Sequence, residues 1–160
     1  MLQIREARNE VGRRIARELL QEHAASLGVN LCFEDFESEA ALSLRACAPP
    51  GGCILLAESN RATHGCVGLC PLSEDICEMK WLFARSGACG GGLARTLALA
   101  AIRKARELGY SRMRLSASAS APEEMSLHEN LGFREIAPSQ GNPTRGTRFL
   151  ELDLGAPRAA

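Results

Sequence analysis

Three consecutive glycines at the junction of a predicted strand and a predicted helix constrain the fold more than any other feature of this sequence. They belong to the segment Cys89, Gly90, Gly91, Gly92, Leu93 and Ala94. Because glycines weaken the interior of a helix or a strand, we expect a loop here. Where a loop enters a helix, unpaired backbone N–H groups and the positive end of the helix dipole surround one point. The segment therefore predicts a site where an anion such as a pyrophosphate approaches the backbone closely.

The composition is typical of one globular domain. The chain has 160 residues, of which 46% are hydrophobic and 24% charged, enough to bury a sizeable core. Lys plus Arg and Asp plus Glu both number 19, and this zero net charge argues against a nucleic-acid partner. No apolar run reaches the length of a membrane span, and the N-terminus lacks the pattern of a signal peptide. We therefore expect no membrane partner, a cytoplasmic location, a single domain over residues 1–155 and a disordered tail over 156–160.

The seven cysteines are predicted to be buried free thiols. They are Cys32, Cys47, Cys53, Cys66, Cys70, Cys77 and Cys89. Their number is odd and no export signal is evident, so a disulfide framework is not expected. A zinc site could be drawn from His64, Cys66, Cys70 and Cys77. However, no CxxC pair occurs, and Cys66 and Cys70 are expected on one face of a strand, so we expect no metal.

Hydrophobic periodicity and turn residues divide the chain into helices and strands. Strands are predicted over residues 2–7, 53–58, 65–72, 76–84, 112–117, 133–136 and 147–154. Helices are predicted over 10–27, 33–47 and 91–108, and from Pro122 to a point before Gly132. The short turns between the strands at 53–84 predict an antiparallel meander. The order is β-α-α-β-β-β-α-β-α-β-β, an α/β architecture with a mixed sheet.

This order, together with three motifs, resembles the GNAT superfamily of N-acetyltransferases. The motifs are residues 77–85, the glycine loop and residues 127–135, which contain the Leu-Gly-Phe that enters the sixth strand of the family. Gly92 and Ala94 occupy the small positions of the family's acyl-CoA loop. The resemblance covers nearly the whole chain. It implies a GNAT-like mixed, mostly antiparallel twisted sheet flanked by helices.

The resemblance also implies a co-substrate and a reaction. The co-substrate is acetyl-CoA, with no metal, and an acetyl group passes to a primary amine of a small molecule, an amino acid or a peptide by direct attack in a ternary complex. The pantetheine arm would run along the strand at 76–84, where an amide near Phe83 or Ala84 would polarise the thioester carbonyl. The implied cofactor-binding residues are Leu82, Phe83, Ala84, Cys89, Gly90, Gly91, Gly92, Leu93, Ala94 and Arg95. A homodimer is compatible with the resemblance.

Four residues depart from what similar family members carry. Trp81 replaces a frequent Arg, Cys89 an Arg or Gln, Ala121 a frequent Asn, and His128 the Tyr that commonly protonates the leaving thiolate. An imidazole can donate the same proton, so His128 is a candidate general acid; the alternative is a helix histidine without a role. These departures also leave open a second function, a non-catalytic acyl-CoA-binding or sensor domain with a degenerate active site.

Glu78 is the candidate general base. A carboxylate that faces a cleft from an otherwise apolar strand can accept the proton of an amine. Alternatively, Glu78 is solvated or pairs with Lys80, two residues along. Trp81, with Phe33 and Phe36, is predicted to line the acceptor pocket; the alternative for Trp81 is packing on the sheet.

Other interpretations of the glycine loop are less favoured. The loop lacks the Lys-Ser/Thr ending of a P-loop and the third glycine of a dinucleotide fingerprint. A thiol at a helix N-terminus is often reactive, but the sequence shows no fixed histidine or acid beside Cys89, so we favour a tolerated substitution. Arg85 and Arg95 flank the loop and are predicted either to neutralise phosphate or to be surface residues, Arg95 being the better candidate.

Overall fold

The structure, a computed structural model, describes residues 2–26, 47, 49–85, 92–118, 122–137 and 147–155. In chain order it contains β1 (Gln3–Glu6), α1 (Glu10–Ser26), β2 (Cys53–Ser59), β3 (Ala62–Pro71), β4 (Ile76–Ala84), α3 (Leu93–Glu107), β5 (Arg112–Ser118), α4 (Pro122–Asn130), β6 (Arg134–Ile136) and β7 (Thr147–Asp153). The predicted mixed α/β fold is confirmed. The helix predicted over residues 33–47 lies outside the described residues, apart from Cys47, which is in a turn.

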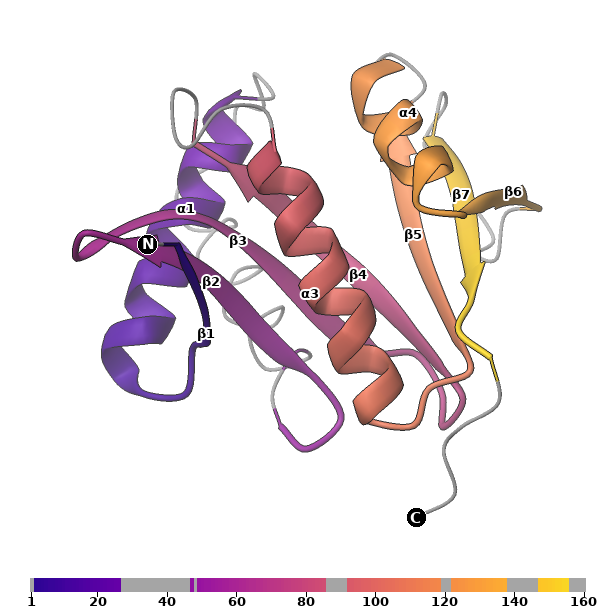
Figure 1. The fold of residues 1–160 in the computed structure, drawn as a ribbon, viewed down its shortest axis with the longest axis horizontal. Coiled ribbons are helices and arrows are strands. Elements are labelled where there is room, and N and C mark those ends of the chain that lie inside the picture. The colour runs from indigo at the N-terminus through magenta and orange to yellow at the C-terminus, as the bar shows by residue number, and fades with distance from the viewer. Residues whose placement is uncertain are drawn as a thin grey trace.

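The strands form one twisted sheet in the order β1-β2-β3-β4-β5-β7-β6 (Figure 1). Neighbouring strands are antiparallel except for β4 and β5, which are parallel. Parallel neighbours need a crossover connection, and α3 supplies it by returning the chain across one face of the sheet. The only parallel pair of the described sheet is therefore the one whose connection begins at the glycine loop.

Helices cover both faces of the sheet, and each face has its own apolar cluster. The larger cluster joins alternate residues of β2–β5 and β7 to Leu93, Leu97 and Ala101 of α3 and to Met125 of α4. We call this the α3 face. The smaller cluster joins the opposite residues of β2 and β3 to Ala16 and Leu19 of α1, and we call this the α1 face (Figure 1).

The helix boundaries follow from local chemistry. Asn9 caps α1, because its Oδ1 accepts a hydrogen bond from the Gly12 N–H at 2.7 Å. Helix α3 ends before Gly109, whose φ of +93° is the left-handed conformation that glycine adopts without strain. None of the described helices is long and apolar enough to cross a membrane.

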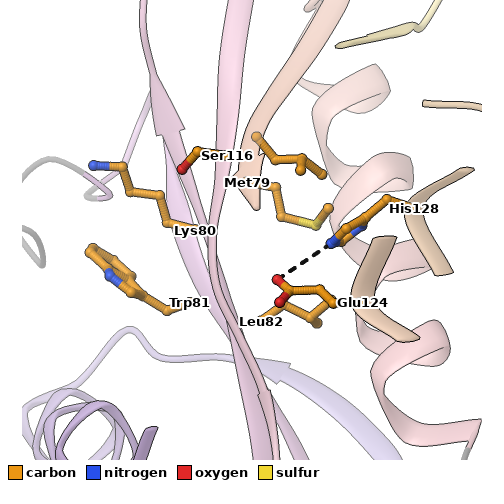
Figure 2. A pocket seen from close by; sticks show the side chains of 8 residues that line it. Met79, Lys80, Trp81, Leu82, Ser116, Glu124 and His128 are labelled. Atoms are coloured by element: carbon orange, nitrogen blue, oxygen red, sulfur yellow. Dashed lines mark ion pairs between the residues drawn. The ribbon is translucent and has the colours of Figure 1, made fainter. Parts of the chain in front are cut away.

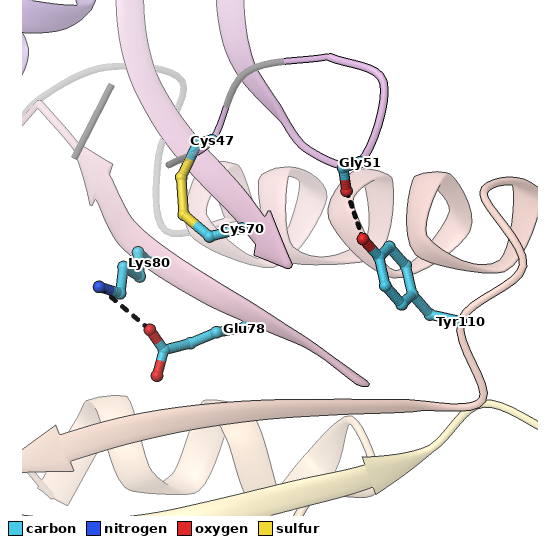
Figure 3. Close-up of a disulfide and its surroundings, with 6 residues drawn as sticks. All are labelled: Cys47, Gly51, Cys70, Glu78, Lys80 and Tyr110. Atoms are coloured by element: carbon cyan, nitrogen blue, oxygen red, sulfur yellow. Dashed lines mark hydrogen bonds and ion pairs between the residues drawn. A yellow bond between two sulfur atoms is a disulfide. The ribbon is translucent and has the colours of Figure 1, made fainter. Parts of the chain in front are cut away.

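The cysteines only partly match the prediction of free thiols. Cys53, Cys66 and Cys77 are free and buried, and burial raises their pKa values to about 11, 12 and 12. Cys47 and Cys70, however, form a disulfide (Figure 3), so the prediction is wrong for this pair. The turn that precedes β2 brings Cys47 back against β3. This contact between distant segments is not evident from the local sequence pattern.

The residues considered for a zinc site do not converge. Cys77 packs in the α3-face cluster, whereas Cys66 and Cys70 pack in the α1-face cluster. Cys70 is also bonded to Cys47, and His64 Nε2 lies 2.7 Å from Ser59 Oγ. Cys32 and Cys89 lie outside the described residues.

Candidate functional site

Strand β4 separates from β5 partway along its length, and a cavity occupies the opening. The two strands pair at three positions, Ile76 with Arg112, Cys77 with Met113 and Glu78 with Arg114. On its other side β4 stays paired with β3 as far as Ala84. Beyond Glu78 lies a cavity of about 340 Å³ (Figure 2). Its lining residues are Met79, Lys80, Trp81, Leu82, Leu115, Ser116, Glu124 and His128.

A bulge in β4 shapes one wall of this cavity. Lys80 pairs with Gly68 and Phe83 with Cys66, so Trp81 and Leu82 together lie opposite the single residue between them on β3. Trp81 has a φ of +54°, a left-handed conformation that is costly for a residue with a large side chain. The bulge directs Trp81 toward the α1-face cluster and Leu82 toward the α3-face cluster. Consecutive side chains of Lys80 and Trp81 consequently line the same side of the cavity (Figure 2).

Gly68 makes room for the indole ring of Trp81. A Cβ atom at Gly68 would lie 2.8 Å from Trp81 Cε3 and 3.1 Å from Cζ3, closer than atoms of this kind approach in proteins. The absence of a side chain on β3 therefore allows the ring to lie against the sheet. Lys80 Nζ lies 5.7 Å from the centroid of the same ring, within the range of a cation–π contact.

His128 lines the opposite side of the cavity, from α4. Only 2% of its surface is exposed, so it is a buried histidine and not a surface residue of the helix. Its Nε2 lies 3.7 Å from Glu124 Oε1, one helical turn earlier, and its ring makes an edge contact with Phe133. Its Nδ1 is buried without a hydrogen-bond partner among the described residues.

Glu78 lies at the closed end of the slot and pairs with Lys80. The Lys80 Nζ to Glu78 Oε1 distance is 3.2 Å (Figure 3), and the side chains are 40% and 15% exposed. The ion pair considered from the sequence therefore exists. Glu78 does not line the cavity itself, but its partner Lys80 does.

The N-terminus of α3 presents open backbone where the anion site was predicted. Gly92 is the N-cap and makes no side-chain capping bond, and the first turn contains no acidic residue. A Cβ atom at Gly92 would meet nothing within 4 Å. Leu93 is buried in the core, whereas Arg95 is exposed in the first turn. The described part of the loop thus leaves the positive end of the helix accessible to an anion.

Arg85, for which a phosphate contact and a surface position were both left open, forms an ion pair with a carboxylate. Its Nε and Nη2 donate to the two carboxylate oxygens of Glu22 at 2.8 and 2.6 Å, and Nη1 donates to the Thr63 carbonyl at 2.7 Å. This bidentate pair lowers the pKa of Glu22 and raises that of Arg85. Arg85 therefore joins α1 to the end of the β3–β4 pair, and Arg95 remains the candidate for phosphate.

The structure brings some of the predicted site residues together. Trp81, Leu82 and His128 line one cavity, and Phe83 and Ala84 follow on the same strand. Ala94 and Arg95 lie with Gly92 and Leu93 at the start of α3. The predicted residues Phe33, Phe36, Cys89, Gly90, Gly91 and Ala121 lie outside the described residues.

Several lining residues were not predicted to have a role in the site. They are Met79, Leu115, Ser116, Glu124 and Lys80, the last of which was expected only as a possible ion-pair partner of Glu78. Glu124 could have been found from its i, i+4 spacing to His128 on one helix. Ser116 could have been found only from the β4–β5 register, because it lies two residues beyond the last pair, Glu78 and Arg114.

The arrangement suits acyl transfer from a thioester. A cavity lies where β4 leaves β5, and the N-terminus of α3 supplies a place for phosphate. A buried imidazole on one side and a carboxylate–ammonium pair on the other provide groups that can move or hold protons.

Comparison with known proteins finds one family and solved structures of the same fold. The family described as "Acetyltransferase (GNAT) family" matches residues 16–133. An uncharacterized N-acetyltransferase of Schizosaccharomyces pombe is 30% identical over 138 residues, which is 85% of each chain. The structure of yncA of Salmonella typhimurium with its cofactor acetyl-CoA has a TM-score of 0.73 at 22% identity and covers 99% of both chains. The spermidine/spermine N-acetyltransferase SpeG of Vibrio cholerae, in mutant forms, has a TM-score of 0.69 at 17% identity, covering 96% of this chain and 95% of its own.

Proposed function

Because the chain belongs to the acetyltransferase (GNAT) family, we propose that it transfers an acetyl group from acetyl-CoA to a primary amine of a small molecule, an amino acid or a peptide. The observation that carries this proposal is the cavity where β4 leaves β5, lined by the buried His128. A structural neighbour carries acetyl-CoA, and another is named for acetylation of a polyamine, so both substrates have precedent in this fold.

Acetyl-CoA would bind with its pyrophosphate at the start of α3 and its pantetheine arm in the slot. Backbone N–H groups of residues 90–94 and the side chain of Arg95 would hold the phosphates. Since Gly92 has no side-chain cap, its helix end offers donors that an anion can satisfy. Backbone of β4 near Leu82, Phe83 and Ala84 would pair with the arm, and one of these amides would polarise the carbonyl.

The chemistry proceeds in one ternary complex. The amine nitrogen attacks the thioester carbonyl, the new C–N bond forms and the C–S bond breaks. The amine proton passes to the Glu78 carboxylate, directly or through water, and His128 donates a proton to the departing thiolate. Glu124 Oε1, 3.7 Å from His128 Nε2, would help to orient the imidazole ring for this donation.

The sequence departures do not favour a non-catalytic domain. His128 stands in place of the usual tyrosine, yet it is buried and lines the cavity, which supports a catalytic role for it. We also propose a cytoplasmic location, a single domain and no metal requirement, as the sequence predicts. A homodimer is a further proposal, tested by light scattering.

The test is CoA release with a panel of primary amines, measured beside acetyl-CoA binding by calorimetry. We expect acetyl-CoA to bind one site per chain and at least one amine to accelerate CoA release well above hydrolysis. Binding without turnover for every amine would support the sensor function instead. Absence of binding would contradict both functions.

A further inference from the structure

We infer that the acceptor carries a carboxylate beside its reactive amine, as an amino acid does, and that Lys80 binds this carboxylate. This inference rests on the proposed acetyl transfer and concerns the acceptor end of the same cavity. It distinguishes zwitterionic amines from polyamines, the substrates for which one structural neighbour is named.

The charged groups of the cavity are separated into two ends. On the α4 side, Glu124 lies beside His128, where the leaving thiolate is expected. On the other side, the ammonium group of Lys80 lies with the hydroxyl-bearing Ser116 and the indole of Trp81 (Figure 2). An acceptor bound beside Trp81 would therefore lie near a cation, and a cation attracts a carboxylate and repels additional ammonium groups.

The Glu78–Lys80 pair matches the charges of a zwitterion. An amino acid that enters can place its ammonium on Glu78 and its carboxylate on Lys80, so that one ion pair is replaced by two. Lys80 lines the cavity and is 40% exposed, whereas its ion-pair partner Glu78 is only 15% exposed. The ammonium would then lie next to Glu78, which would take its first proton and pass it to water, freeing the nitrogen lone pair for attack. Glu78 could then accept the second proton, which the nitrogen loses as the amide forms.

The neighbouring carboxylates offer little to a polyamine. Glu151 of β7 accepts a hydrogen bond from Arg114 Nε of β5 at Oε2, at 2.8 Å, and its Oε1 lies 3.9 Å from Arg112 Nη1. Arg114 is also the β5 partner of Glu78, so a second cation lies at the closed end of the slot. Among the described residues around the acceptor end, Glu78 and Glu151 both have cationic partners, and only Glu78 would exchange its partner for the ammonium of an acceptor. A polyamine needs unpaired carboxylates for its additional ammonium groups, and this surface instead favours an anionic group.

Trp81 provides an apolar wall beside these charges. Its ring is fixed against Gly68 and between β3 and the cavity, as the close approach of the two residues shows. A hydrophobic side chain on the acceptor would pack on this ring. The geometry therefore favours an amino acid with an apolar side chain over a small acidic one.

The experiment compares acceptors that differ only in the carboxylate. Methionine, methioninamide and 3-(methylthio)propylamine form one set, leucine with leucinamide and isoamylamine a second, and spermidine is the polyamine. We expect kcat/KM for each amino acid to exceed that of its amide and its decarboxylated amine by about tenfold or more. Equal or faster turnover of the decarboxylated amines, or of spermidine, would overturn the inference.

Variants of the two lysines in the sequence separate binding from folding. Lys80→Met should raise KM for methionine about tenfold and leave KM for acetyl-CoA unchanged, whereas Lys80→Arg should retain most of the affinity. The KM for 3-(methylthio)propylamine should stay equal or fall in Lys80→Met, because Glu78 is released to bind its ammonium. Lys104→Met, on α3, is the control for loss of a lysine. Equal increases in KM for methionine and its decarboxylated amine would contradict a carboxylate-binding role.

The outcomes also separate this inference from the proposed function. Turnover of decarboxylated amines alone would overturn the carboxylate site and leave acetyl transfer standing. Turnover of no amine at all, with acetyl-CoA bound, would overturn both.

Discussion

Strand β4 is paired with β3 along most of its length but with β5 at only one end, and the two sides differ in packing and polarity. Toward β3 the pairing runs from Pro71 opposite Cys77 to Gly65 opposite Ala84. Toward β5 it stops after Glu78. The paired side lies under α3 and contains fully buried residues such as Leu69 and Leu97. The unpaired side contains the cavity and its polar lining.

The difference shows how one strand serves both stability and function. Pairing on both sides of the bulge and a packed helix stabilise the β3 side, so that β4 keeps its shape when its other edge is open. The bulge at Trp81 lies on this boundary and turns two consecutive side chains toward the site. Mutations on the paired side should therefore change stability, and mutations at the open edge should change binding or catalysis.

The largest expected effect on stability lies on the paired side. Leu97→Ala removes a side chain with 0% exposure from the α3-face cluster, and should lower the free energy of unfolding by about 3 kcal/mol. Leu82→Ala, at the half-buried cavity wall, should lower it by about 1 kcal/mol. Urea unfolding followed by circular dichroism measures both. Equal losses would mean that the two sides of β4 do not differ as described.

Among the residues that line the cavity, we expect substitution of His128 by Gln to have the largest effect on catalysis. Loss of the proton donor should lower kcat about 100-fold, while acetyl-CoA affinity changes little. His128→Tyr, which restores a hydroxyl donor, should recover part of the rate. His64→Gln, in which the altered side chain lies beside Ser59, is the matched control. A rate that stays within twofold in His128→Gln would remove this residue from the mechanism.

Two substitutions of Gly92, at the N-terminus of α3, separate the effect of a negative charge from the effect of side-chain bulk on acetyl-CoA binding. Gly92→Asp places a carboxylate at the proposed pyrophosphate site and should weaken acetyl-CoA binding about 30-fold, or about 2 kcal/mol. Gly92→Ala should bind normally, since a Cβ there meets nothing within 4 Å and the φ of −91° suits alanine. Calorimetry measures both affinities. If both variants bind like the parent, the pyrophosphate does not lie at this helix end.

Gly68→Ala tests the position of Trp81, whose bulge lies between the β3-paired side and the open side of β4. Its Cβ would come within 2.8 Å of the Trp81 ring, so the ring must move, at a cost of about 1 to 2 kcal/mol. Trp81 is the only tryptophan in the sequence, and its emission maximum should shift in this variant. KM for the acceptor should rise several-fold with little change for acetyl-CoA. An unchanged emission spectrum would show that Trp81 does not lie on Gly68.

The smallest effect is expected at the Arg85–Glu22 pair, where the hydrogen bonds from Arg85 hold the pKa of Glu22 below its ordinary value of 4.5. A carboxyl with a lowered pKa stabilises the folded state above pH 4.5 and loses this contribution as the pH falls through its folded pKa. Glu22→Gln should therefore cost less than about 1 kcal/mol at pH 7, because both side chains are over a third exposed. The cost should decrease as the pH falls below 4.5, for example between pH 7 and pH 3. Unfolding free energies at the two pH values measure it, and a constant difference would contradict the linkage.

Periodicity was sufficient to predict most of the fold. The alternation of Met113 and Leu115, the stripe from Leu93 to Ala105 and the turn before Gly109 place β5 and α3 within two residues of their observed bounds. The motif order also indicated the family. These features are local, and each repeats the same signal over several residues.

Contacts between distant segments could not be predicted in the same way. The Cys47–Cys70 disulfide, the Arg85–Glu22 pair and the burial of His128 depend on how separate elements meet. The bulge at Trp81 depends on register with β3, which hydrophobic pattern alone does not specify. The sequence therefore indicated which residue types the site contains but not which of them face one another.

The most direct test is a titration of Trp81 fluorescence with acetyl-CoA, since this single tryptophan lines the cavity where β4 leaves β5. We predict a saturable change in emission with one equivalent of acetyl-CoA per chain, at the same affinity that calorimetry gives, and its loss in Gly92→Asp over the same concentration range. Binding by calorimetry without any change in Trp81 emission would show that acetyl-CoA lies elsewhere, and the slot between β4 and β5 would not be the site.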